Sequence, residues 1–120
     1  MQFESILRDL VSSVDGAQGA ILVDSDGEAV QWHSEADVDR LRLRAAYLAV
    51  LVQAARASLS RLGLGGNVSL RIKYEGAWLL AEDLEQGYFM VLELSPASNL
   101  GQALSRGRPA ARRLRSEIAG

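Results

Sequence analysis

The chain has 120 residues and a nearly balanced charge, with 13 Lys and Arg against 15 Asp and Glu. Its apolar content of 48% suits a single globular domain over residues 1–120 and excludes a disordered chain. The absence of Cys excludes disulfides and zinc–sulfur sites. The uncharged run at residues 45–52 is shorter than the roughly 20 residues that span a bilayer. Because the N-terminus also lacks signal-peptide features, we expect a cytoplasmic protein without membrane insertion.

The first third of the chain predicts a helix followed by a hairpin. Apolar residues recur with a period of 3.6 over residues 2–14, which indicates an amphipathic helix. Residues 19–24 form an unbroken apolar run, so we expect a strand that is covered on both faces. Asp26 and Gly27 suit a tight turn, and residues 29–33 then return as a more peripheral strand.

A long helix over residues 37–62, capped by Ser34 or Asp37, is apolar on too many sides for one core. A helix that rests on a single core shows one apolar stripe and a polar back. Residues 45–52 have no such back, so the helix needs cover from two directions, and a second copy of the chain is the simplest cover. The alternative is that all these apolar residues belong to the core of one protomer.

The second half of the chain predicts three strands and a final helix. The strands span residues 68–74, 77–82 and 88–94, and the helix runs from Ser98 or Asn99 to about residue 119. Pro109 should bend or split this helix near Arg108, because proline lacks the backbone N–H. The fold class is therefore α/β, in the order helix-β-β-helix-β-β-β-helix, with a five-stranded, mostly antiparallel sheet between helix layers.

The strand at residues 68–74 alternates apolar and polar residues and has two readings if it lies at a sheet edge. Arg71 and Lys73 would protect a free edge against aggregation. Alternatively, the strand pairs with the same strand of a second copy about a two-fold axis. We favour pairing, because it would satisfy the unpaired backbone groups of the edge and supports a dimer independently of the long helix.

Four short stretches carry a resemblance to a known family. They are residues 19–27 (GAILVDSDG), 66–70 (GNVSL), 87–92 (GYFMVL) and 98–101 (SNLG). In this order they are similar to the roadblock/dynein light chain family, whose bacterial members look like regulators of gliding motility and polarity. The resemblance implies a non-catalytic homodimer with a continuous sheet across the third strand and the long helices side by side. It also implies a small Ras-like GTPase as partner.

These considerations give two sets of candidate site residues. The expected dimer interface comprises Tyr47, Leu48, Leu51, Val52, Ala55, Leu70 and Ile72. The candidate GTPase contacts are Arg40, Arg44 and Arg56, although a solvated helix surface would also explain these arginines. The expected function is regulation of the nucleotide cycle of the GTPase. The alternative is a scaffold or adaptor dimer without effect on turnover, and a paralogue in place of one copy remains open.

The residues give no support to catalysis or to a cofactor. The only histidine, His33, stands at a strand end without a nucleophile nearby, and no metal-ligand set or nucleotide fingerprint is present. We therefore expect no catalytic, metal or cofactor site. The C-terminal arginines complement a helix dipole, and a patch for nucleic acid or anionic lipid is the weaker alternative for them. They are Arg106, Arg108, Arg112, Arg113 and Arg115.

Overall fold

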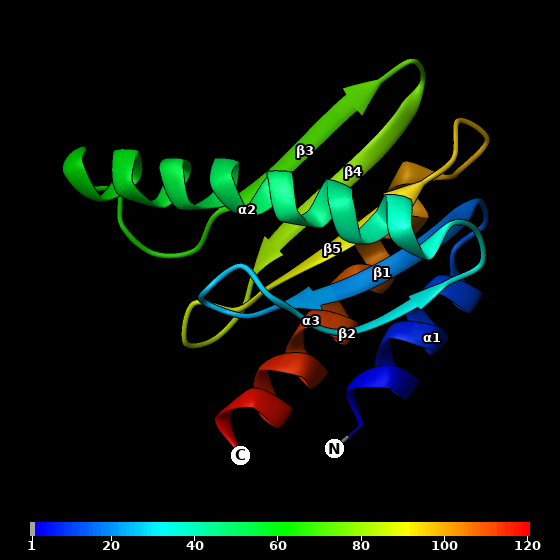
Figure 1. The fold of residues 1–120 in the computed structure, drawn as a ribbon, viewed down its shortest axis with the longest axis horizontal. Coiled ribbons are helices and arrows are strands. Elements are labelled where there is room, and N and C mark those ends of the chain that lie inside the picture. The colour runs from blue at the N-terminus through cyan, green and yellow to red at the C-terminus, as the bar shows by residue number, and fades with distance from the viewer. Residues whose placement is uncertain (1) are drawn as a thin grey trace.

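The computed structural model describes residues 2–120, and eight elements follow in the predicted order (Figure 1). They are α1 (Phe3–Ser13), β1 (Ala17–Val23), β2 (Ala29–Ser34), α2 (Val38–Arg61), β3 (Ser69–Tyr74), β4 (Ala77–Asp83), β5 (Phe89–Leu94) and α3 (Leu100–Ala119). The α/β class and the helix-β-β-helix-β-β-β-helix order are thus confirmed. No helix within residues 2–120 has the length and apolar character needed to cross a membrane.

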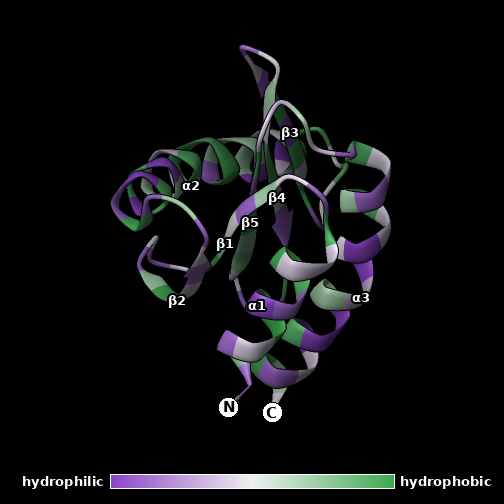
Figure 2. Ribbon diagram, turned by 90° about the vertical axis from the view of Figure 1, so that its right-hand side faces the viewer, coloured by the Kyte–Doolittle hydropathy of each residue, from purple (hydrophilic) through white to green (hydrophobic). Residues whose placement is uncertain are grey.

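The five strands form one antiparallel sheet in the order β2-β1-β5-β4-β3. The strands β1 and β5, which lie inside the sheet, correspond to the apolar runs of the sequence. The strand β5 is buried along its whole length. The helices α1 and α3 cover one face of the sheet, and α2 covers the other (Figure 2). The strands β2 and β3 are the two edges of the sheet, which agrees with the peripheral position expected for the second strand.

Two hydrophobic cores lie on opposite faces of the sheet, because successive strand residues point to opposite sides. Ala20 and Leu22 of β1 pack in the core under α1 and α3. Ile21 and Val23 alternate with them and pack under α2. A strand inside the sheet contributes side chains to both cores. This explains why β1 is an unbroken apolar run.

The ends of α2 follow from local chemistry. The Asp37 side chain accepts a hydrogen bond from the Arg40 backbone N–H at 3.1 Å, which confirms it as the N-cap. After Arg61 the chain leaves the helix, and Gly63 takes a positive φ of 72° that favours glycine. The glycine-rich stretch at residues 63–66 therefore ends a helix.

The predicted split of α3 at Pro109 is wrong, because the helix runs without interruption from Leu100 to Ala119. Pro109 removes the hydrogen bond to the carbonyl of Ser105, but Ser105 is exposed and water can satisfy that group. Residues on both sides of Pro109 pack into the core, namely Ala103, Ala110, Ala111 and Leu114. Packing thus holds both halves of the helix on the sheet.

Candidate interaction site on α2 and the β3 edge

The helix α2 carries two apolar stripes. One stripe is buried on the sheet and consists of Leu41, Ala45, Leu48, Ala49 and Val52. The other faces away from the sheet: Leu43, Tyr47, Val50 and Leu51 are 60%, 70%, 64% and 49% exposed. At 3.6 residues per turn they spread over about 100° of the helix surface. Exposed apolar surface of this kind is typical of interaction sites, so this face of α2 is the candidate site.

The C-terminal part of α2 has little apolar packing on its own protomer, although Arg56 attaches it to Asp83. The last buried residue of the helix is Val52, and about two and a half further turns follow up to Arg61. These turns extend beyond the strands in Figure 1. Leu62 and Leu64 beyond the helix end are 70% and 65% exposed. This end of α2 therefore presents apolar surface that nothing in the protomer covers.

The open edge of β3 adjoins α2. Leu70 and Ile72 point to the face that α2 covers, and both are half-buried against the core beneath it. The opposite face of β3 carries Ser69, Arg71 and Lys73, which are exposed. Because β3 pairs only with β4, one side of its backbone has no strand partner within residues 2–120. The exposed helix face and the free edge thus belong to one side of the molecule.

A buried carboxylate lies beneath α2. Glu93 in β5 is 0% exposed, and its two oxygens receive hydrogen bonds from Arg40 Nη2 at 3.0 Å and Arg44 Nη1 at 2.5 Å. Arg44 also donates to the Tyr74 hydroxyl at 2.9 Å, and Arg40 donates to Gln18 Oε1 at 3.2 Å. The hydrogen bond to Glu93 and its charge raise the pKa of Arg40 above the ordinary value. The Arg40 guanidinium therefore stays charged over the pH range in which proteins fold.

A second ion pair fixes the other end of α2. Arg56 holds Asp83 through Nε, at 3.0 and 3.2 Å from its two oxygens, and through Nη2. Arg56 also donates to the Gly87 carbonyl at 3.1 Å, while Asp83 accepts from the Val68 backbone N–H at 2.8 Å. Asp83 is only 4% exposed. The pair thus connects α2 to the start of β3 and to the β4–β5 turn.

The residues of the predicted dimer interface divide into three groups. Tyr47 and Leu51 are exposed on α2, and Ala55 is half-buried. Leu70 and Ile72 lie at the free edge of the sheet. Leu48 and Val52 are 3% and 2% exposed within one protomer, so they support α2 from below and have little surface left for a partner. The available interface centres on the first two groups.

The three predicted GTPase contacts are Arg40, Arg44 and Arg56, and all have partners inside the protomer. Their side chains remain 35%, 33% and 26% exposed. Sequence reasoning missed the acids that hold them, Glu93 and Asp83. The available signal was Glu93 itself, a lone carboxylate in the apolar strand FMVLEL, because such a buried charge requires cationic partners.

Comparison with known proteins gives a family and several similar folds. A model of the Roadblock/LC7 domain matches residues 5–93. No curated protein matches the chain. A Roadblock/LC7 domain from Streptomyces avermitilis has 19% identity, covers 98% of both chains and gives a TM-score of 0.86.

Two further similar structures are described as MglB. The one from Myxococcus xanthus has 15% identity, covers 99% of this chain and 96% of its own, and gives a TM-score of 0.87. The gliding protein MglB from Thermus thermophilus has 20% identity, covers 93% and 84%, and gives a TM-score of 0.83. At these identities the likeness shows the fold. The domain match and the common fold confirm the resemblance noted in the sequence, and the chain belongs to the Roadblock/LC7 domain family.

Proposed function

We propose that the chain is a homodimeric, non-catalytic module that binds a small Ras-like GTPase. The observation that carries this proposal is the exposed apolar stripe of α2 beside the open edge of β3. The family resemblance supplies the class of partner. The likeness to MglB structures, one of which is described as a gliding protein, agrees with a bacterial regulator of this type.

The two flanks of α2 can be told apart, and one of them faces β3. Arg44 contacts Tyr74 of β3, whereas the Arg42 guanidinium lies 4.7 Å from the Trp32 ring centre on β2. Leu51 follows Arg44 by seven residues, about two helical turns, and therefore lies on the same flank. Tyr47 and Ala55 continue this flank, at three and eleven residues beyond Arg44. In the proposed dimer these residues pack against the α2 helix of the second copy.

Pairing of β3 with β3 of a second copy would complete this interface. Antiparallel pairing about a two-fold axis satisfies the free backbone groups of residues 69–74. It also brings the two α2 helices together, because each α2 covers the face of its sheet to which Leu70 and Ile72 of β3 point. Each apolar side chain that becomes buried contributes about 1.5 kcal/mol or more before association costs.

A second part of the apolar surface would remain open in such a dimer. Leu43 and Val50 lie seven residues apart on the outward side of α2, with Ala46 and Ala54 beside them. This outward surface points away from both the sheet and the β3 flank, so a second α2 helix does not cover it. We assign it to the GTPase, and the part-exposed Arg40, Arg44 and Arg56 remain the candidate polar contacts.

The ion pairs of these arginines favour a positional mechanism. Insertion of an arginine finger into the GTPase would require one of them to leave Glu93 or Asp83, and the buried carboxylate would then lose its partner. The dimer surface would instead hold the mobile loops of the GTPase in one state. The same ion pairs also suit a scaffold that leaves GTP turnover unchanged.

Affinity capture from host lysate tests the partner class. The wild-type protein serves as bait with a non-hydrolysable GTP analogue or with GDP, and bound proteins are identified by mass spectrometry. We expect a small GTPase in the GTP sample only, and its loss with a Val50→Asp bait but not with the exposed control Ser60→Asp. Recovery of no GTPase in either state would contradict the proposal.

A hydrolysis assay with the captured GTPase then separates the regulator from the scaffold. Faster or slower phosphate release on addition of the dimer would establish regulation. Unchanged hydrolysis together with equal binding in both nucleotide states would establish the scaffold.

A further inference from the structure

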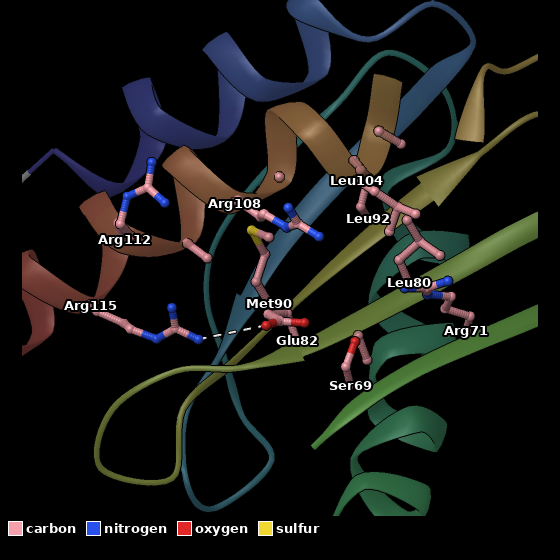
Figure 3. A pocket seen from close by; sticks show the side chains of 14 residues that line it. Ser69, Arg71, Leu80, Glu82, Met90, Leu92, Leu104, Arg108, Arg112 and Arg115 are labelled. Carbon is pink, nitrogen blue, oxygen red and sulfur yellow. Dashed lines mark ion pairs between the residues drawn. The ribbon is translucent and has the colours of Figure 1, made fainter. Parts of the chain in front are cut away.

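We propose that the cavity between α3 and the β3–β4 edge binds a single-chain amphiphilic anion, an alkyl phosphate or an acyl carboxylate. This inference goes beyond the proposed function and does not depend on it. The cavity lies on the face of the sheet opposite α2 (Figure 3). It combines an apolar floor with an arginine rim, and that combination indicates the class of ligand.

The floor exists because α3 carries small residues where it passes over the sheet. Ala103, Gly107 and Ala111 line the cavity from α3, and Leu80, Met90 and Leu92 line it from β4 and β5. A Cβ atom added at Gly107 would meet no atom within 4 Å, so this part of the helix leaves open space. The cavity measures about 280 Å³, near the lower end of ligand-binding pockets.

Four arginines and a single glutamate line the cavity, and Figure 3 shows the Arg112 side chain pointing away from the floor. Arg108, Arg112 and Arg115 come from α3, and Arg71 comes from β3 on the opposite side. Arg115 is engaged, since its Nη2 lies 3.6 Å from Glu82 Oε1 and donates to the Asp83 carbonyl at 2.8 Å. Across residues 2–120, the other three arginines have no carboxylate partner within ion-pair distance.

The arginines and the apolar floor line the same cavity, so one amphiphilic molecule can contact both. Figure 3 shows the Arg108 side chain reaching from α3 over Met90 and Leu92, with Arg71 beyond them on the opposite side. Guanidinium groups bind phosphate and carboxylate through paired N–H donors. The apolar floor would take the attached chain. The volume suits one chain and not a two-chain lipid, and the cavity lining includes no aromatic side chain on which a nucleic-acid base could stack.

Calorimetric titration of the purified protein with decyl phosphate and decanoate, below their micelle concentrations, tests the inference. We expect saturable binding of at least one of them at one site per chain. Inorganic phosphate, which lacks the chain, and decyl maltoside, which lacks the charge, should bind at least about tenfold more weakly, since each lacks half of the contacts.

Matched variants locate the site. Gly107→Leu should fill the cavity and lower the affinity at least about tenfold, while it improves helix propensity and leaves the fold intact. Gly107→Ala, which adds only one methyl group, should keep most of the affinity. Arg108→Gln should lower the affinity about tenfold, the loss expected for one charge-assisted contact. Arg106→Gln, on the same helix outside the cavity, should leave it unchanged.

Four results would overturn the inference. They are no binding of either amphiphile, equal binding of inorganic phosphate or decyl maltoside, unchanged affinity in Gly107→Leu, and binding to phosphatidylglycerol vesicles without binding of the free amphiphiles. The last result would replace the single-chain site with a membrane-binding surface.

Discussion

Glu93 is the residue on which the attachment of α2 to the sheet depends most. Its carboxylate is fully buried in β5 and is held by Arg40 and Arg44, one helical turn apart on α2. Only one register and one orientation of the helix bring both guanidiniums to the two oxygens. A buried charge of this kind costs free energy by itself and is tolerated only when its partners are in place.

Removal of both arginines should therefore lower the free energy of unfolding far more than their partial exposure suggests. The double variant Arg40→Met/Arg44→Met leaves the Glu93 charge buried and unpaired, and we expect a loss of about 3–5 kcal/mol in the free energy of unfolding. Adding Glu93→Met should recover most of the loss. Urea unfolding measures all three proteins, with Arg42→Met as the control on the same helix. Simple additivity of the changes would contradict this account.

The sequence could not predict these pairs, for a physical reason. Glu93 lies 53 and 49 residues from its two partners, and helix periodicity carries no information about contacts over that distance. The arginines looked like a solvated surface because they flank an uncharged segment. The lone carboxylate in β5 was visible, but only the fold shows that α2 passes over it.

At the scale of elements, α2 presents two adjacent residues with opposite environments. Leu48 is 3% exposed and packs on the sheet, whereas Tyr47 is 70% exposed. Leu48→Glu should unfold the protomer, because it buries an unpaired charge. Tyr47→Glu should keep the helical circular dichroism spectrum but lose the dimer.

Circular dichroism and light scattering on the two variants, beside Ser60→Glu, measure this contrast. A folded Leu48→Glu protein, or a Tyr47→Glu protein that remains a dimer, would show that the two faces of α2 are assigned incorrectly.

Replacement by alanine should change the stability of the protein in opposite directions at Gly107 and at Gly16. Gly107 lies inside α3 with open space around it, so Gly107→Ala should raise stability by about 0.5–1 kcal/mol. Gly16 has a φ of 84°, and an added Cβ would lie 2.6 Å from the Ser98 Cα. Gly16→Ala should therefore destabilise the protein by more than the other change stabilises it. Thermal melts measure both, and shifts in the same direction would contradict the argument.

The order and type of the elements could be predicted because each depends on local pattern. Periodicity identified α1, the unbroken apolar runs identified β1 and β5, and Asp37 and Asn99 cap their helices as expected. The effect of Pro109 was predicted wrongly because the sequence shows only that a backbone hydrogen bond is lost. The burial of Ala110 and Leu114, which holds the helix beyond Pro109, depends on tertiary packing. The cavity beside Gly107 could not be predicted either, because it depends on how α3 lies over the sheet.

At the scale of the whole molecule, the protomer leaves one side of its fold uncovered. The exposed flank of α2, the overhanging end of that helix and the free edge of β3 lie together. If a second copy covers them, folding and association are linked. The melting temperature should then rise with protein concentration over a hundredfold range. Scanning calorimetry measures this shift, and a melting temperature independent of concentration would indicate a self-sufficient monomer.

The most direct measurement is the mass of the protein in solution by size-exclusion chromatography with light scattering. We expect a particle of twice the 13.0 kDa chain for the wild type. For Leu51→Glu, on the β3-facing flank of α2, we expect a single-chain mass or aggregation. A wild-type protein that elutes as a stable, folded monomer, or a Leu51→Glu dimer indistinguishable from it, would contradict the proposed interface.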